Sequence, residues 1–144
     1  MDNQERMLNL AQVAVRYAQS FDEELNFSKE SIESVDKILD YYFEDLKNCA
    51  EDEKPTEQQT WSMAMIWGAY IGEVMRRELG PDYIWTDEEI FEETTPHIRK
   101  VNTSIRTFPI NKVYKRLVNG IEDNVVSFVD VGIEFLRDGM PKSL

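Results

Sequence analysis

The chain has 144 residues, of which 42% are hydrophobic, and it carries a formal net charge of −12 at pH 7. This length and hydrophobic content predict one folded domain with its own core and exclude a largely disordered chain. The strong negative charge argues against contact with nucleic-acid phosphates, so we expect no nucleic-acid partner. With Cys49 as its single cysteine, the sequence excludes an internal disulfide, and it offers no Cys/His spacing typical of a metal site.

The first part of the chain predicts two helices. Residues 5–20 repeat apolar side chains at helical spacing. A second helix is expected to begin after the N-cap residue Ser28, with an apolar stripe that continues to Leu46 and acidic side chains mostly off that stripe. The segment "AEDEKP", residues 50–55, predicts a charged loop because Pro55 disfavours helical backbone at the preceding residue.

Residues 57–79 predict a central helix with clear signals at both ends. Thr56 and Gln59 form a capping-box pair at its start, and "GP" at residues 80–81 gives a stop signal at its end. Its uncharged run, residues 58–72, has only 15 residues and begins with polar ones. A transmembrane helix needs about 20 apolar residues, so we expect a buried helix and no membrane association. The opening segment "MDNQERMLNL" lacks the basic and apolar regions of a secretion signal, which leads us to expect a cytoplasmic protein.

Helical spacing divides the side chains of this central helix into two apolar faces and a polar wedge. One face carries Trp61, Met65, Gly68, Gly72, Met75 and Leu79. The opposite face carries Met63, Trp67, Tyr70 and Val74, and the wedge between them carries Ser62, Ala69, Glu73, Arg76 and Arg77. Two opposing apolar faces are typical of a helix between two layers. Each glycine costs about 1 kcal/mol of helix propensity, so the small residues predict close approach of a backbone or a large side chain.

Glu73 in the wedge has two interpretations. In the first, it forms an exposed ion pair with Arg76 or Arg77, which contributes a few tenths of a kcal/mol. In the second, the wedge faces a cleft in which Glu73 acts as an acid or base or as an acceptor for a bound group. A lone carboxylate without a second carboxylate, histidine or serine nearby does not define a reaction. We therefore assign no catalytic residue and, since no Gly-rich phosphate loop is present, no cofactor.

The hydrophobic period changes after the central helix. Residues 83–86, "YIWT", predict a strand with residues 90–95, "IFEETT", as its partner, and residues 101–107 alternate apolar and polar side chains as a further strand. Helices are expected at residues 109–118 and 122–137, the second with an inner face of Val125, Phe128, Val129, Gly132, Phe135 and Leu136. This order predicts a single α+β domain over residues 1–144, with about five helices around the central one and a small sheet of two or three antiparallel strands at about 83–107.

Positive charge is concentrated in residues 96–121, which contain no acidic residue. The six basic residues of this segment are Arg99, Lys100, Arg106, Lys112, Lys115 and Arg116. One interpretation is that the segment docks against the acidic helices and offsets their mutual repulsion, and the other is a basic pocket for an anionic ligand. His97 is expected to be an ordinary polar residue in a loop, and Cys49 a half-buried packing residue.

The runs "GAYIGEVMRRELGPDYIW", "FPINKVYKRLVNG" and "DNVVSF" resemble a group of small uncharacterised bacterial proteins. In that group a helix with a G-x-Y-x-G-E pattern precedes a Trp-bearing strand, and a Pro-headed basic helix ends in a turn. The resemblance covers about residues 60–130. It implies a compact α+β domain and brings no catalytic residues, and it marks Gly68, Tyr70, Gly72, Glu73 and Trp85 as positions to examine.

We expect a non-catalytic module that binds a basic protein partner, because the surface is acidic and no catalytic constellation is recognisable. The contact surface is expected on an acidic helix face or on "TDEEIFEE", residues 86–93, where Ile90 and Phe91 could serve as apolar anchors. The acidic helix face consists of Glu30, Glu33, Asp40 and Glu44.

Two alternatives to this module are left open. The first is a small enzyme or ligand-binding protein whose cleft joins residues of the central helix and the first strand to basic residues further along the chain. Its candidate residues are Glu73, Tyr70, Arg77, Trp85, Lys112, Lys115 and Arg116. The second is a homo-oligomeric structural protein, for which a homodimer is the simplest form.

Overall fold

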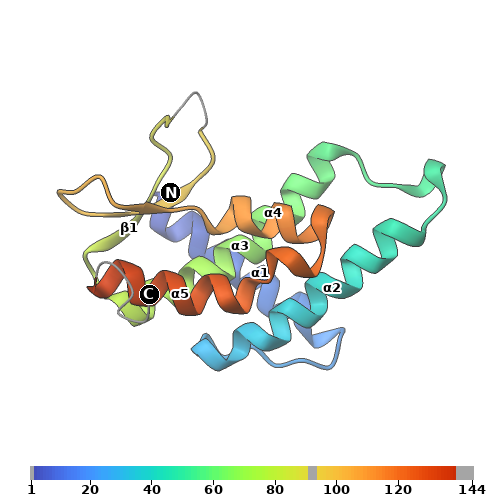
Figure 1. The fold of residues 1–144 in the computed structure, drawn as a ribbon, viewed down its shortest axis with the longest axis horizontal. Coiled ribbons are helices and arrows are strands. Elements are labelled where there is room, and N and C mark those ends of the chain that lie inside the picture. The colour runs from blue at the N-terminus through green and yellow to red at the C-terminus, as the bar shows by residue number, and fades with distance from the viewer. Residues whose placement is uncertain (1, 91–93, 139–144) are drawn as a thin grey trace.

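Within residues 2–90 and 94–138, which the computed structural model describes, the chain forms five α-helices and one three-stranded antiparallel sheet (Figure 1). The helices are α1 (Asn3–Gln19), α2 (Ile32–Asn48), α3 (Glu57–Leu79), α4 (Pro109–Asn119) and α5 (Val125–Asp138). The strands are β1 (Tyr83–Thr86), β2 (His97–Lys100) and β3 (Arg106–Thr107). Short 3-10 turns lie at η1 (Lys29–Ser31), η2 (Glu51–Glu53) and η3 (Ile121–Asp123). This is the α+β architecture predicted from the order of the elements.

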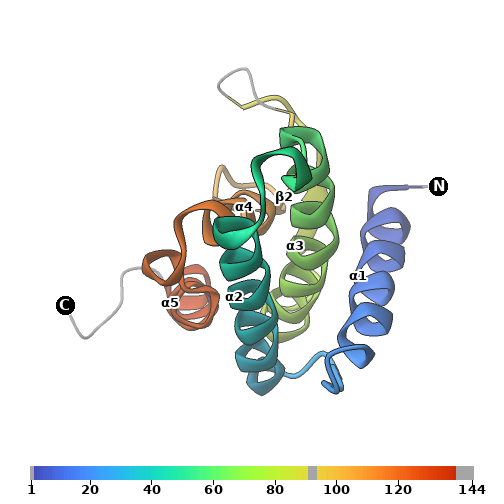
Figure 2. The same cartoon turned by 90° about the vertical axis from the view of Figure 1, so that its right-hand side faces the viewer.

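The helix α3 has the bounds that the sequence predicts, because its end signals are local. Thr56 Oγ1 accepts a hydrogen bond from the backbone N–H of Gln59 at 3.1 Å, and Gln59 Oε1 accepts one from the N–H of Thr56 at 2.8 Å. Gly80 ends the helix with a φ of 106°, a conformation that glycine adopts without strain. Figure 2 shows α3 between α1 on one side and α2 and α4 on the other, and its main contacts are with α1 and α4.

The polar wedge expected on α3 is not a solvated surface. All residues from Trp67 to Met75 are buried, including Ala69 and Glu73 of the wedge. Trp85 of β1 hydrogen-bonds to Glu73, and α1 packs along α3, and helical spacing alone reveals neither of these tertiary contacts. Of the wedge, Ser62 and Arg77 remain exposed.

The glycines of α3 mark two close contacts, as their spacing predicts. A Cβ atom on Gly68 would lie 2.6 Å from the backbone Cα of Ile110, at the start of α4. A Cβ atom on Gly72 would lie 2.2 Å from Cζ2 of Trp85 on β1. Gly68 therefore admits a helix backbone and Gly72 admits an indole ring, and the packing interpretation of the two glycines is confirmed.

The sheet has the order β1–β2–β3, and its pairing corrects two sequence predictions. Tyr83 pairs with Lys100 and Thr86 with His97, so the partner of β1 is β2 rather than residues 90–95. Of those residues, 91–93 lie outside the described part of the chain. The strand expected over residues 101–107 is wrong in its first half, where the chain turns with Asn102 at a φ of 63°. Asparagine tolerates this left-handed conformation and is typical of turns, which its place in an alternating pattern obscures.

The last helix begins later than predicted and presents a slightly different face to the core. The turn η3 follows Gly120, whose φ is 89°, so α5 starts at Val125 instead of residue 122. Its buried side chains are Val125, Val129, Ile133 and Leu136. Phe135, predicted on the inner face, is 43% exposed. The face is rotated because the core-facing side chains follow a spacing of four, four and three residues from Val125.

A buried polar network connects α2, α4 and α5. The side chain of Arg116 on α4 is fully buried and donates from Nε to Asp36 Oδ1 at 3.0 Å and from Nη2 to Asp40 Oδ1 at 2.9 Å. The Asp36 carboxylate also accepts hydrogen bonds from the N–H of Val125 and from Asn124 Nδ2, both at 3.1 Å. Asp36 thereby caps the start of α5. This network confirms that part of the basic segment docks against an acidic helix.

Candidate functional site

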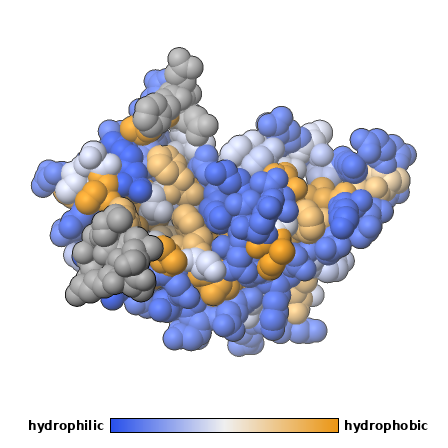
Figure 3. All heavy atoms as spheres, in the orientation of Figure 1, coloured by the Kyte–Doolittle hydropathy of each residue, from blue (hydrophilic) through white to orange (hydrophobic). Residues whose placement is uncertain are grey.

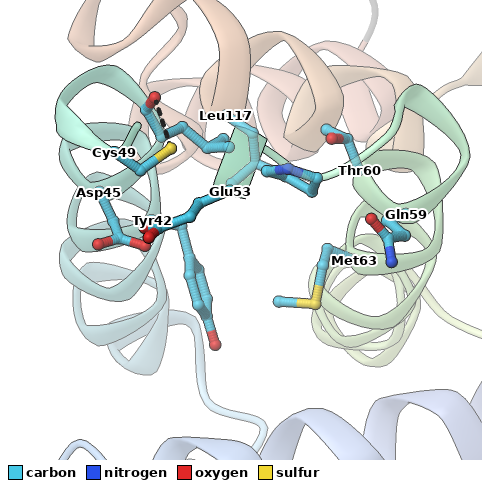
Figure 4. A pocket seen from close by; sticks show the side chains of 10 residues that line it. Tyr42, Asp45, Cys49, Glu53, Gln59, Thr60, Met63 and Leu117 are labelled. Carbon is cyan, nitrogen blue, oxygen red and sulfur yellow. Dashed lines mark hydrogen bonds between the residues drawn. The ribbon is translucent and has the colours of Figure 1, made fainter. Parts of the chain in front are cut away.

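A hollow opens between the C-terminal half of α2 and the start of α3 (Figure 4). Its volume is about 300 Å³. We call it the α2–α3 hollow. Its apolar lining comes from three helices and from the loop between α2 and α3: Tyr42, Leu46, Pro55, Met63 and Leu117. Its polar lining residues are Asp45, Cys49, Glu53, Gln59 and Thr60. In Figure 4, the ring of Tyr42 and the thioether of Met63 face each other across the opening.

Local sequence signals explain why the chain leaves this space open. The helix α2 ends at Asn48 because Cys49 adopts extended backbone, with a φ of −76° and a ψ of 159°. Lys54 is also extended, as its position before Pro55 requires. The connection therefore arches from the end of α2 to the capping box of α3, and η2 forms one side of the opening instead of packing into it.

Two exposed carboxylates, Asp45 and Glu53, line the hollow, and three more lie close to them in the sequence. The exposed acidic residues at the end of α2, in η2 and at the start of α3 form a group that we call the acidic end: Glu44, Asp45, Asp52, Glu53 and Glu57. Among the residues that the structure describes, none of these five side chains has a hydrogen-bond or ion-pair partner. Gln59 and Thr60, by contrast, are already hydrogen-bonded within the first turn of α3. Free acceptors in the lining are therefore the carboxylates of Asp45 and Glu53.

Tyr42 belongs to an aromatic cluster that borders the hollow. Its ring lies edge-on to Phe21, with centroids 5.6 Å apart, and tilted against Trp67 at 6.3 Å. Burial raises the pKa of Tyr42, and the neighbouring phenols of Tyr17 and Tyr41 raise it further. The Tyr42 hydroxyl therefore stays neutral at physiological pH and offers a polar contact without acting as a base.

A second hollow of about 330 Å³ lies beside the first and shares four residues with it: Leu46, Pro55, Thr60 and Leu117. Its lining differs in charge, because it includes Lys47 and Lys54 and no carboxylate. Lys54 is paired with Glu51 at 3.1 Å. The two hollows therefore share these four residues and differ in charge: carboxylates line the first, and lysines line the second.

The residues that the sequence suggested for a cleft around Glu73 lie in separate clusters. Glu73 is buried, and its Oε2 accepts hydrogen bonds from Arg76 Nη1 at 2.7 Å and from Trp85 Nε1 at 2.9 Å. Trp85 is also buried, and its ring fills the space above Gly72. The structure therefore brings Glu73 and Trp85 together, as the cleft hypothesis expected. They are buried partners of each other and do not line a cleft.

Tyr70 and Arg77 form a second cluster, around Phe27. The Tyr70 hydroxyl accepts a hydrogen bond from the N–H of Phe27 at 2.8 Å and lies 2.6 Å from the Ser31 hydroxyl. The guanidinium of Arg77 lies over the Phe27 ring at 4.0 Å from its centroid. Burial raises the pKa of Tyr70. This cluster fastens the connection between α1 and α2 to the middle of α3.

Two of the basic candidates on α4, Arg116 and Lys112, form ion pairs with acidic residues other than Glu73. Burial alone would lower the pKa of Arg116, but its hydrogen bonds to Asp36 and Asp40 raise it, so the guanidinium stays charged. Lys112 pairs with Asp123 at 2.9 Å, and this contact lowers the pKa of that carboxyl group. Lys115 is exposed.

His97 corrects another expectation, because it is neither in a loop nor an ordinary surface residue. It is the first residue of β2, is 1% exposed, and stacks on Phe108. Its Nδ1 lies 3.0 Å from the carbonyl oxygen of Thr95, and its Nε2 lies 2.7 Å from Nη1 of Arg106. Arginine can only donate, so Nε2 accepts and Nδ1 carries the proton. Burial lowers the pKa of His97, which keeps the ring neutral.

Two further findings concern the described part of the chain as a whole. No group of three or more His, Cys, Asp or Glu side chains within it is placed to hold a metal ion. None of its helices combines the length and the apolar character needed to cross a bilayer.

No family model matches this chain, and neither the curated proteins nor the solved structures provide a match. The functional inference therefore depends on the residues of the site themselves.

The sequence did not reveal the α2–α3 hollow, although some of its parts were visible. The sequence predicts an apolar stripe on α2 that continues to Leu46, and a loop that ends at Pro55. Their convergence with Leu117, which follows Leu46 by 71 residues, arises from the packing of α4 against α2. The one usable signal was that the α2 stripe continues into the last turn, next to a run of acidic residues.

Proposed function

We propose that the protein is a non-catalytic binding module that recognises a basic protein partner with its acidic end. The observation that carries the proposal is an apolar hollow between the end of α2 and the start of α3 that Asp45 and Glu53 line, with three more exposed carboxylates close to these two in the sequence. None of the five has a partner among the described residues. Protein contacts combine such apolar centres with complementary charge at their rims. At this end of Figure 3, on its right-hand side, apolar atoms are visible between hydrophilic ones.

The internal distribution of charge supports the proposal. Most basic residues of segment 96–121 are engaged within the fold: Arg116 with Asp36 and Asp40, Lys112 with Asp123, and Arg99 and Arg106 with Glu88. With these bases engaged, exposed carboxylates carry most of the net charge of −12, and the acidic end groups five of them. A concentrated negative field of this kind speeds encounter with a cationic partner.

The same pairs change which acidic residues are free to meet a partner. Asp40, one of the residues expected on the contact surface, is held by Arg116, although its side chain is 47% exposed. Glu88 of the "TDEEIFEE" segment is held by Arg99 and Arg106, and Phe91 lies outside the described residues. Glu44 retains its place in the proposed surface, where it is joined by residues of η2 and of the start of α3.

A capture experiment tests the proposal. The wild-type protein and a Glu44→Lys/Asp45→Lys/Glu53→Lys variant would be immobilised and exposed to an extract of the source cell at low and moderate salt. A matched control, Glu5→Lys/Glu24→Lys/Glu134→Lys, makes the same change of charge at exposed residues far from the hollow along the chain. We expect wild type and control to retain the same basic protein and the acidic-end variant to lose it.

Kinetics with the purified partner complete the test. Association should slow roughly tenfold or more as salt rises, while dissociation changes less, because salt screens the long-range attraction. Recovery of no basic protein, or of one that binds all three proteins equally, contradicts the proposal.

A further inference from the structure

We infer that the α2–α3 hollow receives the side chain of an arginine or lysine from that partner, with its alkyl stem inside and its charged head at Asp45 and Glu53. This inference rests on the proposed function and specifies the chemistry that the hollow recognises.

The size of the hollow favours a single long side chain. Pockets that bind drug-sized molecules and cofactors have volumes of about 300–1,000 Å³, and the α2–α3 hollow, at about 300 Å³, lies at the lower limit. Lining residues such as Asp45, Glu53 and Gln59 are exposed, so a partner chain can reach the hollow from the surface. A narrow, open site of this size suits one side chain presented from outside.

The walls of the hollow suit an aliphatic stem. Leu46, Met63 and Leu117 present alkyl and thioether groups, and Tyr42 presents its ring. Lysine and arginine bury their methylene groups along such apolar surfaces while the charged head remains hydrated. Methionine adapts its shape to the group that it contacts, so Met63 can close around a stem of either residue.

The polar groups of the lining select for positive charge. Asp45 and Glu53 provide acceptors, and none of the lining residues that the structure describes carries a positive charge. The ring of Tyr42 adds a surface on which a guanidinium or ammonium group can lie. Lys47, in the neighbouring hollow, repels a cation from that side and so favours the half with the carboxylates, whereas Lys54 is paired with Glu51. An anionic ligand would meet the carboxylates without a compensating charge.

Two small probes of opposite charge test this assignment. Pentylguanidinium carries the head group of arginine on a slightly longer alkyl stem, and hexanoate has a similar stem with a carboxylate. Binding would be followed by the NMR signal of the Met63 methyl group, assigned with Met63→Leu, and by the rate at which N-ethylmaleimide alkylates Cys49. We expect pentylguanidinium to shift the methyl signal and slow alkylation, and hexanoate to do neither.

Neutralising the carboxylates separates recognition by charge from simple apolar contact. Asp45→Asn/Glu53→Gln should weaken pentylguanidinium binding about threefold to tenfold, as expected for two exposed charge contacts. Glu24→Gln/Glu134→Gln is the matched control, because it also neutralises two exposed carboxylates but neither lines the hollow, and it should leave binding unchanged. Equal shifts with hexanoate, no shift with either probe, or full affinity of the neutralised variant overturns the inference.

The outcome is distinguishable from failure of the proposed function. If pentylguanidinium does not bind but the basic partner still requires the acidic end, the side-chain assignment is wrong and the proposed function stands. If pentylguanidinium binds but no basic protein does, the proposed function is wrong. The hollow then still recognises a cationic group, but that group does not come from a basic protein.

Discussion

Gly72 and Gly132 both lie at helix contacts, but a methyl group would meet different neighbours at the two positions. At Gly72 the added Cβ would lie 2.2 Å from Cζ2 and 2.3 Å from Cη2 of Trp85, which is buried and hydrogen-bonded to Glu73. At Gly132 the nearest atom would be the terminal methyl group of Met75, at 3.1 Å. A rigid indole cannot give way as a flexible thioether can.

We therefore expect Gly72→Ala to lower the free energy of unfolding by about 1–3 kcal/mol, although alanine favours helix, because overpacking outweighs the gain in propensity. Gly72→Leu should lower it by several kcal/mol. Gly132→Ala is the control and should change it by less than about 1 kcal/mol, since its gain in propensity offsets a small shift of Met75. Urea denaturation measures all three, and equal stabilities for the two alanine variants would refute the contact at Trp85.

Glu73→Gln tests the burial of the Glu73 carboxylate. Its side chain is 7% exposed and accepts hydrogen bonds from Arg76 and Trp85. A glutamine oxygen can still accept one of these bonds, but the charge of Arg76 loses its partner. We expect a loss of about 1–3 kcal/mol in the free energy of unfolding, more than for the exposed pair that the sequence suggested.

The pair of Glu78 and Arg137 provides the comparison for this change. It is about half exposed and its atoms are 3.8 Å apart, so Glu78→Gln should cost less than about 0.5 kcal/mol. Thermal or urea unfolding of both variants decides, and a Glu73→Gln variant as stable as Glu78→Gln would show that the carboxylate is solvated.

At the scale of the elements, local signals determined what could be predicted from sequence. The bounds of α3 were predictable because Thr56, Gln59 and Gly80 act on the backbone next to them. The partner of β1 was not, because the match of Tyr83 to Lys100 depends on the length and course of the connection rather than on residue type. The α2–α3 hollow was missed for a related reason: its walls come from elements that meet only when α4 packs against α2 and α3.

The strand β2 contains the residue with the clearest expected pH response. His97 is the single histidine of the chain, and burial, Arg106 and Arg99 lower its pKa, whereas the Thr95 carbonyl and Glu88 act in the opposite direction. The folded state therefore binds fewer protons at this site than the unfolded state, whose histidine titrates at about 6.5. Stability should be highest above that pH and fall as the pH decreases through and below it.

The His97→Gln variant isolates this effect. Acidification also reduces the negative charge of the whole molecule, which changes stability independently of His97. The variant lacks the imidazole and therefore measures this second effect alone. We expect the thermal midpoint of the wild type to fall relative to that of the variant between about pH 7.5 and pH 5.5, and amide exchange in β2 and β3 to speed up. A difference between the two proteins that stays constant over this range would refute the buried neutral histidine.

The whole molecule combines shielded ion pairs inside with unpaired carboxylates outside. Pairs such as Arg116 with Asp36 are buried and only weakly screened, whereas the acidic end is exposed to solvent ions. Added salt should therefore reduce the repulsion between carboxylates more than it weakens the buried pairs, and the net charge of −12 makes this repulsion the stronger of the two effects. We expect the thermal midpoint to rise by a few degrees from low salt to near-physiological salt.

A neutralised variant, Glu44→Gln/Asp45→Asn/Glu53→Gln, locates the source of this response. It should be more stable than the wild type at low salt and should respond less to added salt, because part of the repulsion is removed. Calorimetry at several sodium chloride concentrations measures both effects. A midpoint that falls as salt rises would show instead that ion pairs dominate the electrostatic contribution to stability.

The Arg116–Asp36 network also has a consequence for the order in which the chain folds during synthesis. Its bonds join positions 80 and 89 residues apart, so the ends of a long loop must meet before Asp36 has its donors. While only α1 to α3 have left the ribosome, Asp36 has no such partners and α3 has no α4 against Gly68. The three helices then expose apolar surface that α4 and α5 later cover, a state prone to aggregation. Native packing of the first half of the chain therefore waits until residues 116–125 have been synthesised and can reach Asp36.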